Sequence, residues 1–130
     1  MDRELLAKGV GASPGTATGL IVFRSEDAVS IAATGKSVIL VRVETTPEDV
    51  PGIRAAAGIV TTRGGLTGDA AIVARSLGKP CIAGCNPLRV DYEKSELIVW
   101  RDSTDDQTDI VLAKGDVITI NGANGEIWRG

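Results

Sequence analysis

Histidine is absent from this sequence of 130 residues, and cysteine and aromatic residues are scarce. The chain holds two cysteines, two tryptophans, one tyrosine and one phenylalanine. Without histidine, the commonest protein ligand of transition metals is missing. Cys81 and Cys85 are separated by three residues, which fits neither a redox C-x-x-C pair nor half of a four-ligand zinc site. We therefore expect no metal, no cofactor and two small thiols packed in the core.

Long apolar runs and runs of one charge are missing as well. Fourteen basic and seventeen acidic residues give a formal net charge of −3, and no polybasic run occurs. A balance of this kind does not favour a nucleic-acid or membrane surface. Residues 1–8 lack the apolar region of a signal peptide, and no stretch of about 18 apolar residues could span a bilayer. We expect a cytoplasmic protein whose partners are neither nucleic acid nor membrane.

Glycine and aliphatic residues, by contrast, are plentiful. The sequence has sixteen glycines, 43% hydrophobic residues and 24% charged residues. This composition suits a folded α/β domain rich in small residues rather than a disordered chain. The length suits one compact core, so we predict a single domain over residues 1–130.

Short β-rich runs alternate with helical windows through the first two thirds of the chain, which predicts a layered mixed α/β domain. From Tyr92 onward the pattern changes to strands and turns, with Asn and Gly at residues 121–125 suited to a hairpin. The polar stretch 101–109 is predicted to be a mobile loop. The predicted strands cover residues 19–23, 37–43, 58–62, 80–83, 96–100, 117–120 and 126–128.

Two helices are predicted between the first three strands. Ser25 can cap the first, which acidic residues open and Gly35 closes. Thr46 can cap the second, with Pro47 at the first helical position, where its missing N–H costs nothing. Proline and glycine at residues 51–52 follow within one turn, so this helix is predicted to be short or kinked before a new turn over residues 53–57.

The third helix has the clearest pattern. Thr67 is its predicted N-cap, and Gly78 with the proline that follows predicts its end. Its apolar face is predicted to comprise Ala70, Val73, Ala74 and Leu77, spaced at i, i+3, i+4 and i+7. Small residues on that face predict close packing.

Residues 62–69 are the stretch with the strongest chemical signal, because a predicted strand passes there through glycines into a helix N-terminus. Such a junction gathers unpaired backbone N–H groups and the positive end of the helix dipole, which favour an anion. Gly64, Gly65 and Gly68 would let a ligand approach the backbone closely, and Arg63 adds donors suited to phosphate. From the residues alone, an anion site and an ordinary strand-to-helix turn both remain open.

Several segments together show a family resemblance. The run Thr-Arg-Gly-Gly-Leu-Thr at residues 62–67, continued by Ala-Ala-Ile-Val-Ala-Arg at 70–75, is similar to the signature of the swivelling phosphohistidine domain of phosphoenolpyruvate-utilising enzymes. Residues 38–49, the opening Gly-Ala-Ser-Pro-Gly at 11–15 and the close at 115–126 resemble the pyruvate phosphate dikinase branch. The resemblance covers about residues 9–130 and implies a layered β/β/α swivelling domain.

In that family the domain carries phosphate on one histidine between a nucleotide-binding domain and a phosphoenolpyruvate/pyruvate-binding domain. The resemblance therefore implies these two domains as partners, in cis or in trans. By position, Asp69 occupies the place of the carrier histidine, and Thr67 matches the threonine two residues before it, a target of regulatory phosphorylation in plant dikinases. Gly68 replaces the usual serine or cysteine, while Arg63, Gly64 and Gly65 stay as the expected phosphate-binding residues.

Three hypotheses follow from an aspartate at the carrier position. The chain can be a dikinase-like carrier domain that no longer transfers phosphate, with Asp69 stabilising the helix N-terminus instead. It can be an interaction or regulatory module in which Asp69 imitates the charge of a phosphorylated state. It can also be a subunit of a split dikinase that uses Asp69 or Thr67 as the acceptor. For Arg75, a solvated or ion-paired position on the helix is favoured over a phosphate ligand.

Overall fold

The computed structural model describes residues 4–63, 69–85, 87–99 and 110–130, with the backbone alone of Asp69. Within these residues the chain forms strands, three α-helices and one short 3-10 helix, η1. The helical elements are α1 Ser25–Ala32, η1 Pro47–Asp49, α2 Val50–Ala55 and α3 Asp69–Leu77. The strands are β1 Glu4–Lys8, β2 Val10–Ser13, β3 Thr16–Val22, β4 Val38–Arg42, β5 Gly58–Thr61, β6 Cys81–Ala83, β7 Leu88–Asp91, β8 Glu96–Val99, β9 Ile110–Ala113, β10 Val117–Asn121 and β11 Glu126–Arg129.

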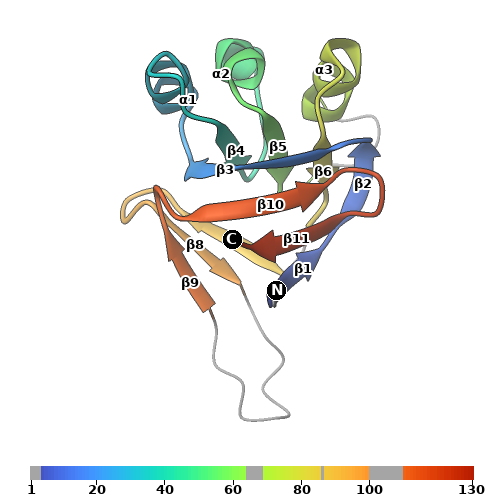
Figure 1. Ribbon diagram of the computed structural model, residues 1–130, viewed down its shortest axis with the longest axis vertical. Helices are drawn as coiled ribbons and strands as arrows, with labels where there is room; N and C mark the ends of the chain where they lie inside the picture. The colour runs from blue at the N-terminus through green and yellow to red at the C-terminus, as the bar shows by residue number, and fades with distance from the viewer. Residues whose placement is uncertain (1–3, 64–68, 86, 100–109) are drawn as a thin grey trace.

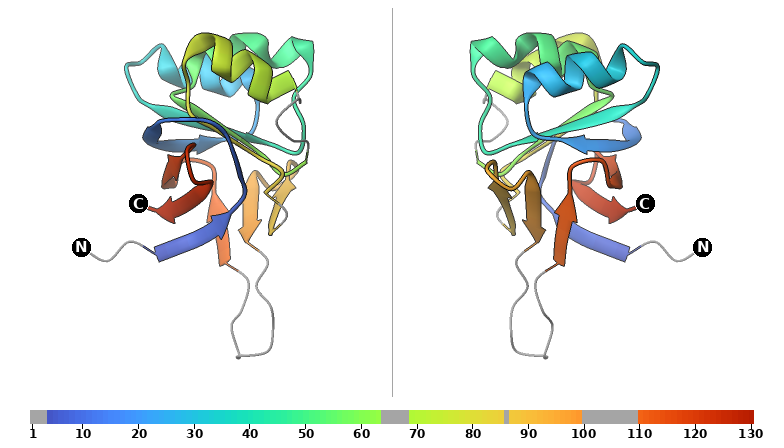
Figure 2. Two further views of the ribbon diagram at one scale, coloured as in Figure 1. Left: turned by 90° about the vertical axis from the view of Figure 1, so that its right-hand side faces the viewer. Right: turned by 90° about the vertical axis from the view of Figure 1, so that its left-hand side faces the viewer.

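The elements stack in three layers, which confirms the predicted layered α/β class (Figure 1). A large mixed sheet has the order β1-β11-β10-β3-β4-β5-β6-β2, with β3, β4, β5 and β6 parallel to one another. All three helices cover one face of this parallel part. A small antiparallel sheet, β7-β8-β9, lies on the other side, as the two side views show (Figure 2).

The two faces of the large sheet bury different kinds of side chain. On the helix side the core is rich in alanine, with Ala28, Ala56, Ala71 and Ala74 almost completely buried. On the small-sheet side it is built mainly from branched aliphatic residues, together with Phe23. Small residues of this kind let helices approach a sheet closely.

The predicted second helix begins as expected, whereas the cap of the first does not. Thr46 forms a capping box with Asp49 ahead of Pro47, and the chain then continues as α2 through the proline and glycine rather than restarting after them. Ser25 is wrong as an N-cap, because Arg24 holds that position and makes no side-chain cap. The Ser25 hydroxyl accepts a hydrogen bond from the N–H of Gly52 at 2.8 Å, so it joins α1 to α2.

The end of the third helix agrees with the sequence, but its buried face is shifted. Gly78 follows α3 with φ +68°, a left-handed conformation that favours glycine. Ala70 and Ala74 are buried as predicted, but Leu77 is wrong as a core residue, because 39% of it is exposed. Ala71 is buried in its place on the face that meets the sheet. The predicted cap, Thr67, lies outside the described residues.

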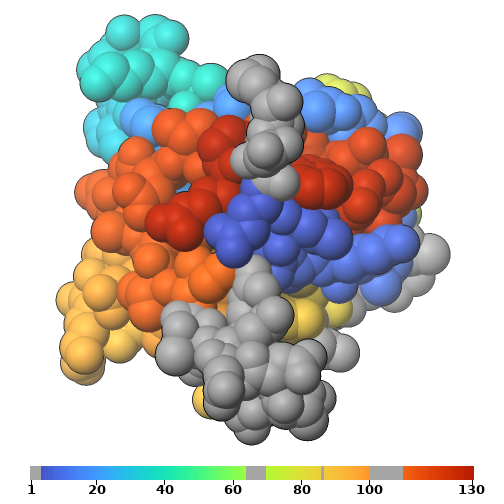
Figure 3. Space-filling view, turned by 60° about the horizontal axis from the view of Figure 1, so that its bottom comes forward, coloured from blue at the N-terminus to red at the C-terminus, as the bar shows by residue number. Residues whose placement is uncertain are grey.

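All the predicted strands are present with slightly shifted ends, while β1, β2, β7 and β9 were not predicted. The β10–β11 hairpin is confirmed, with the Asn121 side chain accepting the N–H of Ala123 at 2.9 Å. A Cβ atom at Gly122 would lie 1.8 Å from the Ser13 carbonyl oxygen, so this glycine lets the hairpin turn meet the opening glycine motif. β1 pairs with β11, and both lie on the face opposite the helices (Figure 3). The loop predicted at 101–109 lies outside the described residues.

Candidate functional site

Arg63 lies just beyond β5, where its backbone is held by hydrogen bonds and its side chain is exposed. Its N–H donates to the carbonyl of Val43 at 3.0 Å. Its carbonyl accepts a hydrogen bond from the hydroxyl of Thr61 at 2.8 Å, and Thr61 is buried. Because both backbone groups are held, the exposed Arg63 side chain starts from a well-defined position.

A polar groove of about 410 Å³ opens beside Arg63 between the large sheet and the small sheet. Arg89, from β7, lines it together with Arg63, and none of the described lining residues is acidic. The groove residues, as far as the structure describes them, are Val43, Thr62, Arg63, Leu88, Arg89 and Val90. Sequence reasoning found Arg63 but missed Arg89, because β7 was not predicted and nothing local places it near residue 63.

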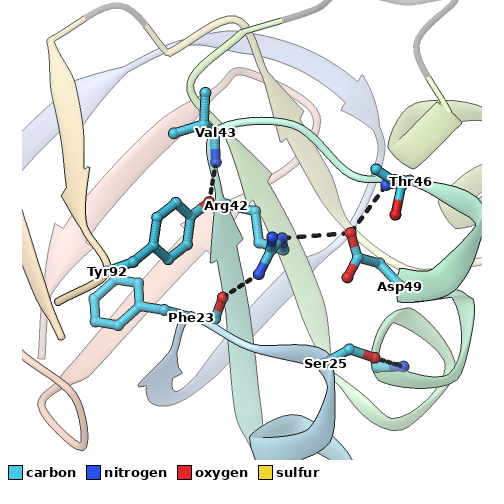
Figure 4. Close-up of polar contacts among 8 residues, drawn as sticks. Phe23, Ser25, Arg42, Val43, Thr46, Asp49 and Tyr92 are labelled. Atoms are coloured by element: carbon cyan, nitrogen blue, oxygen red, sulfur yellow. Dashed lines mark hydrogen bonds and ion pairs between the residues drawn. The ribbon is translucent and has the colours of Figure 1, made fainter.

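A cluster of polar contacts surrounds Arg42 and includes Val43, which lines the groove (Figure 4). The Arg42 Nη1 atom donates to the Phe23 carbonyl at 2.6 Å, and Nε lies 3.3 Å from an Asp49 carboxylate oxygen. This second contact is an ion pair rather than an aligned hydrogen bond. The Arg42 guanidinium also lies 5.0 Å from the centre of the Tyr92 ring, within cation–π range.

Tyr92 links this cluster to Arg63 through one residue. The Val43 N–H donates to the Tyr92 hydroxyl oxygen at 2.9 Å, and the Val43 carbonyl holds the Arg63 N–H. On the other side of the cluster, Asp49 accepts the N–H of Thr46 at 2.9 Å. Hydrogen bonds therefore hold residues 43–49 at both ends. The Val43 carbonyl, at one of these ends, fixes the backbone position of Arg63.

The predicted junction between β5 and α3 is described only at its two ends. β5 ends at Thr61 and α3 begins at Asp69, so Asp69 stands in the first turn of the helix, as expected. Gly64, Gly65, Thr67 and Gly68, which were predicted to form the rest of the site, lie outside the described residues. Of the predicted site residues, the structure therefore places Arg63 on the groove and Asp69 at the start of α3.

Comparison with known proteins assigns the chain to a family. Residues 34–125 match the family described as PEP-utilising enzyme, mobile domain. This chain belongs to that family. The resemblance stated from the sequence is thereby confirmed, and the mobile domain is found here with an arginine-lined groove next to its signature segment.

The mobile domain is also similar to curated pyruvate phosphate dikinases. It is 49% identical over 128 residues to the pyruvate, phosphate dikinase of Rhizobium meliloti and 51% identical over 128 residues to pyruvate, phosphate dikinase 2 of Oryza sativa. These matches cover 98% of this chain and 13% of each relative's length. A solution structure of Enzyme I aligns with 70% of this chain and 29% of its own, at 24% identity and a TM-score of 0.44.

Arg75 of the mobile domain has a structural partner, in keeping with the favoured interpretation. It is exposed on α3, and its Nη1 atom donates to the carbonyl of Ala12 in β2 at 3.3 Å. This contact ties the helix to the edge of the large sheet. Arg75 does not line the groove that contains Arg63 and Arg89.

The two cysteines of the mobile domain are buried free thiols, as predicted. Burial raises the pKa of both Cys81 and Cys85 to about 12, although the charge of Arg75 acts to lower the pKa of Cys81. Neither thiol supplies a thiolate near neutral pH, so neither is a nucleophile there. Among the described residues, no group of three or more acidic or cysteine side chains could hold a metal ion. No helix in the described ranges is long and apolar enough to cross a membrane.

Proposed function

We propose that this mobile domain is the phosphoryl-carrier domain of a pyruvate phosphate dikinase-like enzyme with Asp69 in place of the carrier histidine, and that it does not transfer phosphate by itself. The observation that carries the proposal is the combination of family membership with a sequence that contains no histidine. Asp69 is the first residue of α3, so the substitution falls where the signature segment enters the helix.

The chemistry of the two side chains explains the expected loss of transfer. A neutral imidazole is a nucleophile near pH 7 and forms a high-energy N–P bond that can pass its phosphoryl group onward. A carboxylate is already ionised and would have to form an acyl phosphate against charge repulsion. Phosphoacceptor aspartates are helped by Mg²⁺ and neighbouring carboxylates, and the described residues offer no such acidic cluster.

At the first turn of a helix the same carboxylate favours the fold. A negative charge near a helix N-terminus interacts favourably with the dipole by about 0.3–1 kcal/mol. From this position in the sequence we expect Asp69 to stabilise α3 while it occupies the place of the nucleophile. Arg63 remains in the signature as the proposed phosphate-binding residue, with Gly64, Gly65 and Gly68 as the proposed backbone that approaches the ligand.

The partners in this proposal are a nucleotide-binding domain and a phosphoenolpyruvate/pyruvate-binding domain, present in cis or in trans. Residues 1–130 act as one swivelling body between them. Two observations support this. The two hydrophobic cores share the large sheet, and the pairing of β1 with β11 joins the first described strand to that same sheet. A body packed in this way can turn as one unit between two partners.

A labelling experiment tests the proposal. The chain is incubated with phosphoenolpyruvate labelled in its phosphoryl group and with the phosphoenolpyruvate-binding domain of the Rhizobium meliloti dikinase. The wild type is expected to stay unlabelled. The double variant Gly68→Ser/Asp69→His, which restores the family pattern, is expected to gain acid-labile label, whereas Gly68→Ser/Asp69→Asn is the matched control and is expected to gain none.

Other results would contradict the proposal in distinguishable ways. Label on the wild type that hydroxylamine removes would identify Asp69 as an acceptor and an active split dikinase. Acid-stable label on the wild type would identify Thr67. If neither the wild type nor the histidine variant gains label, the carrier assignment fails and an interaction module takes its place.

A further inference from the structure

The groove beside Arg63 contains a second arginine that comes from a different sheet. Arg63 follows β5 of the large sheet, and Arg89 lies in β7, at the edge of the small sheet. The small sheet lies beneath the large one in the side views, with β7 and β8 coloured yellow to orange (Figure 2). Two arginines that are 26 positions apart in the sequence thus line one groove.

The charge of these two arginines is not balanced within the part of the chain that the structure describes. Arg24, Arg42, Arg75 and Arg129 each contact a carbonyl or a carboxylate there. Arg54, Arg63 and Arg89 have no such contact with a described residue, and of these three, Arg63 and Arg89 line the groove. The nearest carboxylate along β7 belongs to Asp91, and one of its oxygens accepts the N–H of Lys94 at 3.1 Å within the following turn.

We propose that Arg89 is the second cation of the anion-binding groove and that the pair selects doubly charged phosphoryl groups over singly charged anions. This inference rests on the proposed phosphate-binding role of Arg63. Two guanidinium forks can each donate two N–H groups to the oxygens of one phosphoryl group. The groove volume of about 410 Å³ is within the usual range of about 300–1,000 Å³ for small-molecule sites.

The two cations have fixed starting points, which favours recognition of one anion by both. Arg63 is held through its backbone by Val43 and Thr61. Arg89 lies opposite Ile98 in the ladder between β7 and β8, and its strand neighbour Leu88 is buried in the core. Because both residues sit on the same packed core, little backbone order has to be gained when an anion binds.

Titration of the full chain with inorganic phosphate tests Arg89 directly. Amide and arginine Nε–H signals of the ¹⁵N-labelled protein report the affinity, and the same titration with sulfate and nitrate compares a dianion with a monoanion. Arg89→Gln is expected to weaken phosphate binding about three- to tenfold and to reduce the preference for sulfate over nitrate. Arg89→Lys keeps the charge but loses the guanidinium fork. Its phosphate affinity is expected to lie between those of the wild type and Arg89→Gln.

Arg54→Gln is the matched control, because Arg54 is an exposed arginine of α2 that does not line the groove. If Arg89→Gln binds phosphate as well as Arg54→Gln does while Arg63→Gln binds it weakly, the role of Arg89 is overturned and the site at Arg63 stands. Absence of phosphate binding by the wild type, or binding that neither groove variant weakens, also overturns the inference. The labelling of the histidine variant is independent of these outcomes, so it shows separately whether the carrier assignment holds.

Discussion

Arg42 and Arg63 lie at the same end of neighbouring strands, yet their surroundings are opposite. Arg42 ends β4 opposite Thr61 of β5, and Arg63 follows two residues later. The Arg42 side chain is only 23% exposed and contacts a carbonyl, a carboxylate and an aromatic ring. Arg63 is exposed and lines a groove with Arg89. A half-buried cation must be paired to be tolerated, whereas an exposed one can be left for a ligand.

Arg42 and Arg63 perform two different functions at the same end of these strands. Arg42 contacts Asp49 and Tyr92, which hold residues 43–49 in place. The Val43 carbonyl then accepts the N–H of Arg63 and positions its backbone. The Arg63 side chain makes no hydrogen bond or ion pair with the described part of the fold. We therefore expect changes in the Arg42 cluster to lower stability and changes at Arg63 to lower anion binding.

Asp49→Ala is expected to give the largest loss of stability. It leaves Arg42 half-buried without its carboxylate and the Thr46 N–H without its acceptor. We expect the free energy of unfolding to fall by about 2–3 kcal/mol in urea denaturation. Glu48→Ala removes the same charge from an exposed neighbour and should change stability by less than about 0.5 kcal/mol. Equal losses of unfolding free energy in the two variants would mean that the Arg42–Asp49 pair does not stabilise residues 42–49.

Burial raises the pKa of the Cys81 thiol to about 12, although the charge of Arg75 acts to lower it. The folded thiol keeps its proton where an unfolded thiol, with an ordinary pKa of 9.0, loses it. Stability should therefore fall as pH rises from about 9 toward 12, by about 1 kcal/mol per thiol at pH 10. Urea unfolding at pH 8 and pH 10 measures this fall, and Cys81→Ala should reduce it. An unchanged pH dependence in that variant would contradict the burial argument.

Tyr92→Phe is expected to have a smaller effect, because only the hydroxyl is removed. The Val43 N–H loses its acceptor, while the ring stays in place beside Arg42. We expect a loss of about 1 kcal/mol in unfolding free energy and faster hydrogen exchange at the Val43 amide. Tyr92→Leu, which also removes the ring, should cost more. Slow exchange at Val43 in the phenylalanine variant would show that the hydroxyl does not order this strand end.

Much of the fold could be predicted from the sequence because its signals are local. The Thr46 cap is encoded in four consecutive residues, and the end of α3 in one glycine, so both were found. Ser25 carries the same local signal as a cap, but its hydroxyl bonds to Gly52, 27 residues away. Leu77 fits the helical period, yet the small side chains of Ala71 and Ala74 let α3 meet the sheet on a shifted face.

The candidate site was predictable only in part for the same reason. The signature segment marked Arg63 and Asp69, because a strand, glycines and a helix start follow one another along the chain. Arg89 carries no local signal, since β7 is a four-residue strand containing two charged residues. Its place beside Arg63 arises from the packing of two sheets, and the support from Tyr92 arises in the same way.

Measuring stability and phosphate affinity on the same two variants tests the central comparison most directly. Arg42→Met should lose about 2 kcal/mol of unfolding free energy, and its folded fraction should still bind phosphate. Arg63→Gln should stay within about 0.5 kcal/mol of the wild type and lose about three- to tenfold in phosphate affinity. The account is contradicted if Arg63→Gln unfolds more readily than Arg42→Met, or if Arg42→Met weakens phosphate binding as much as Arg63→Gln does.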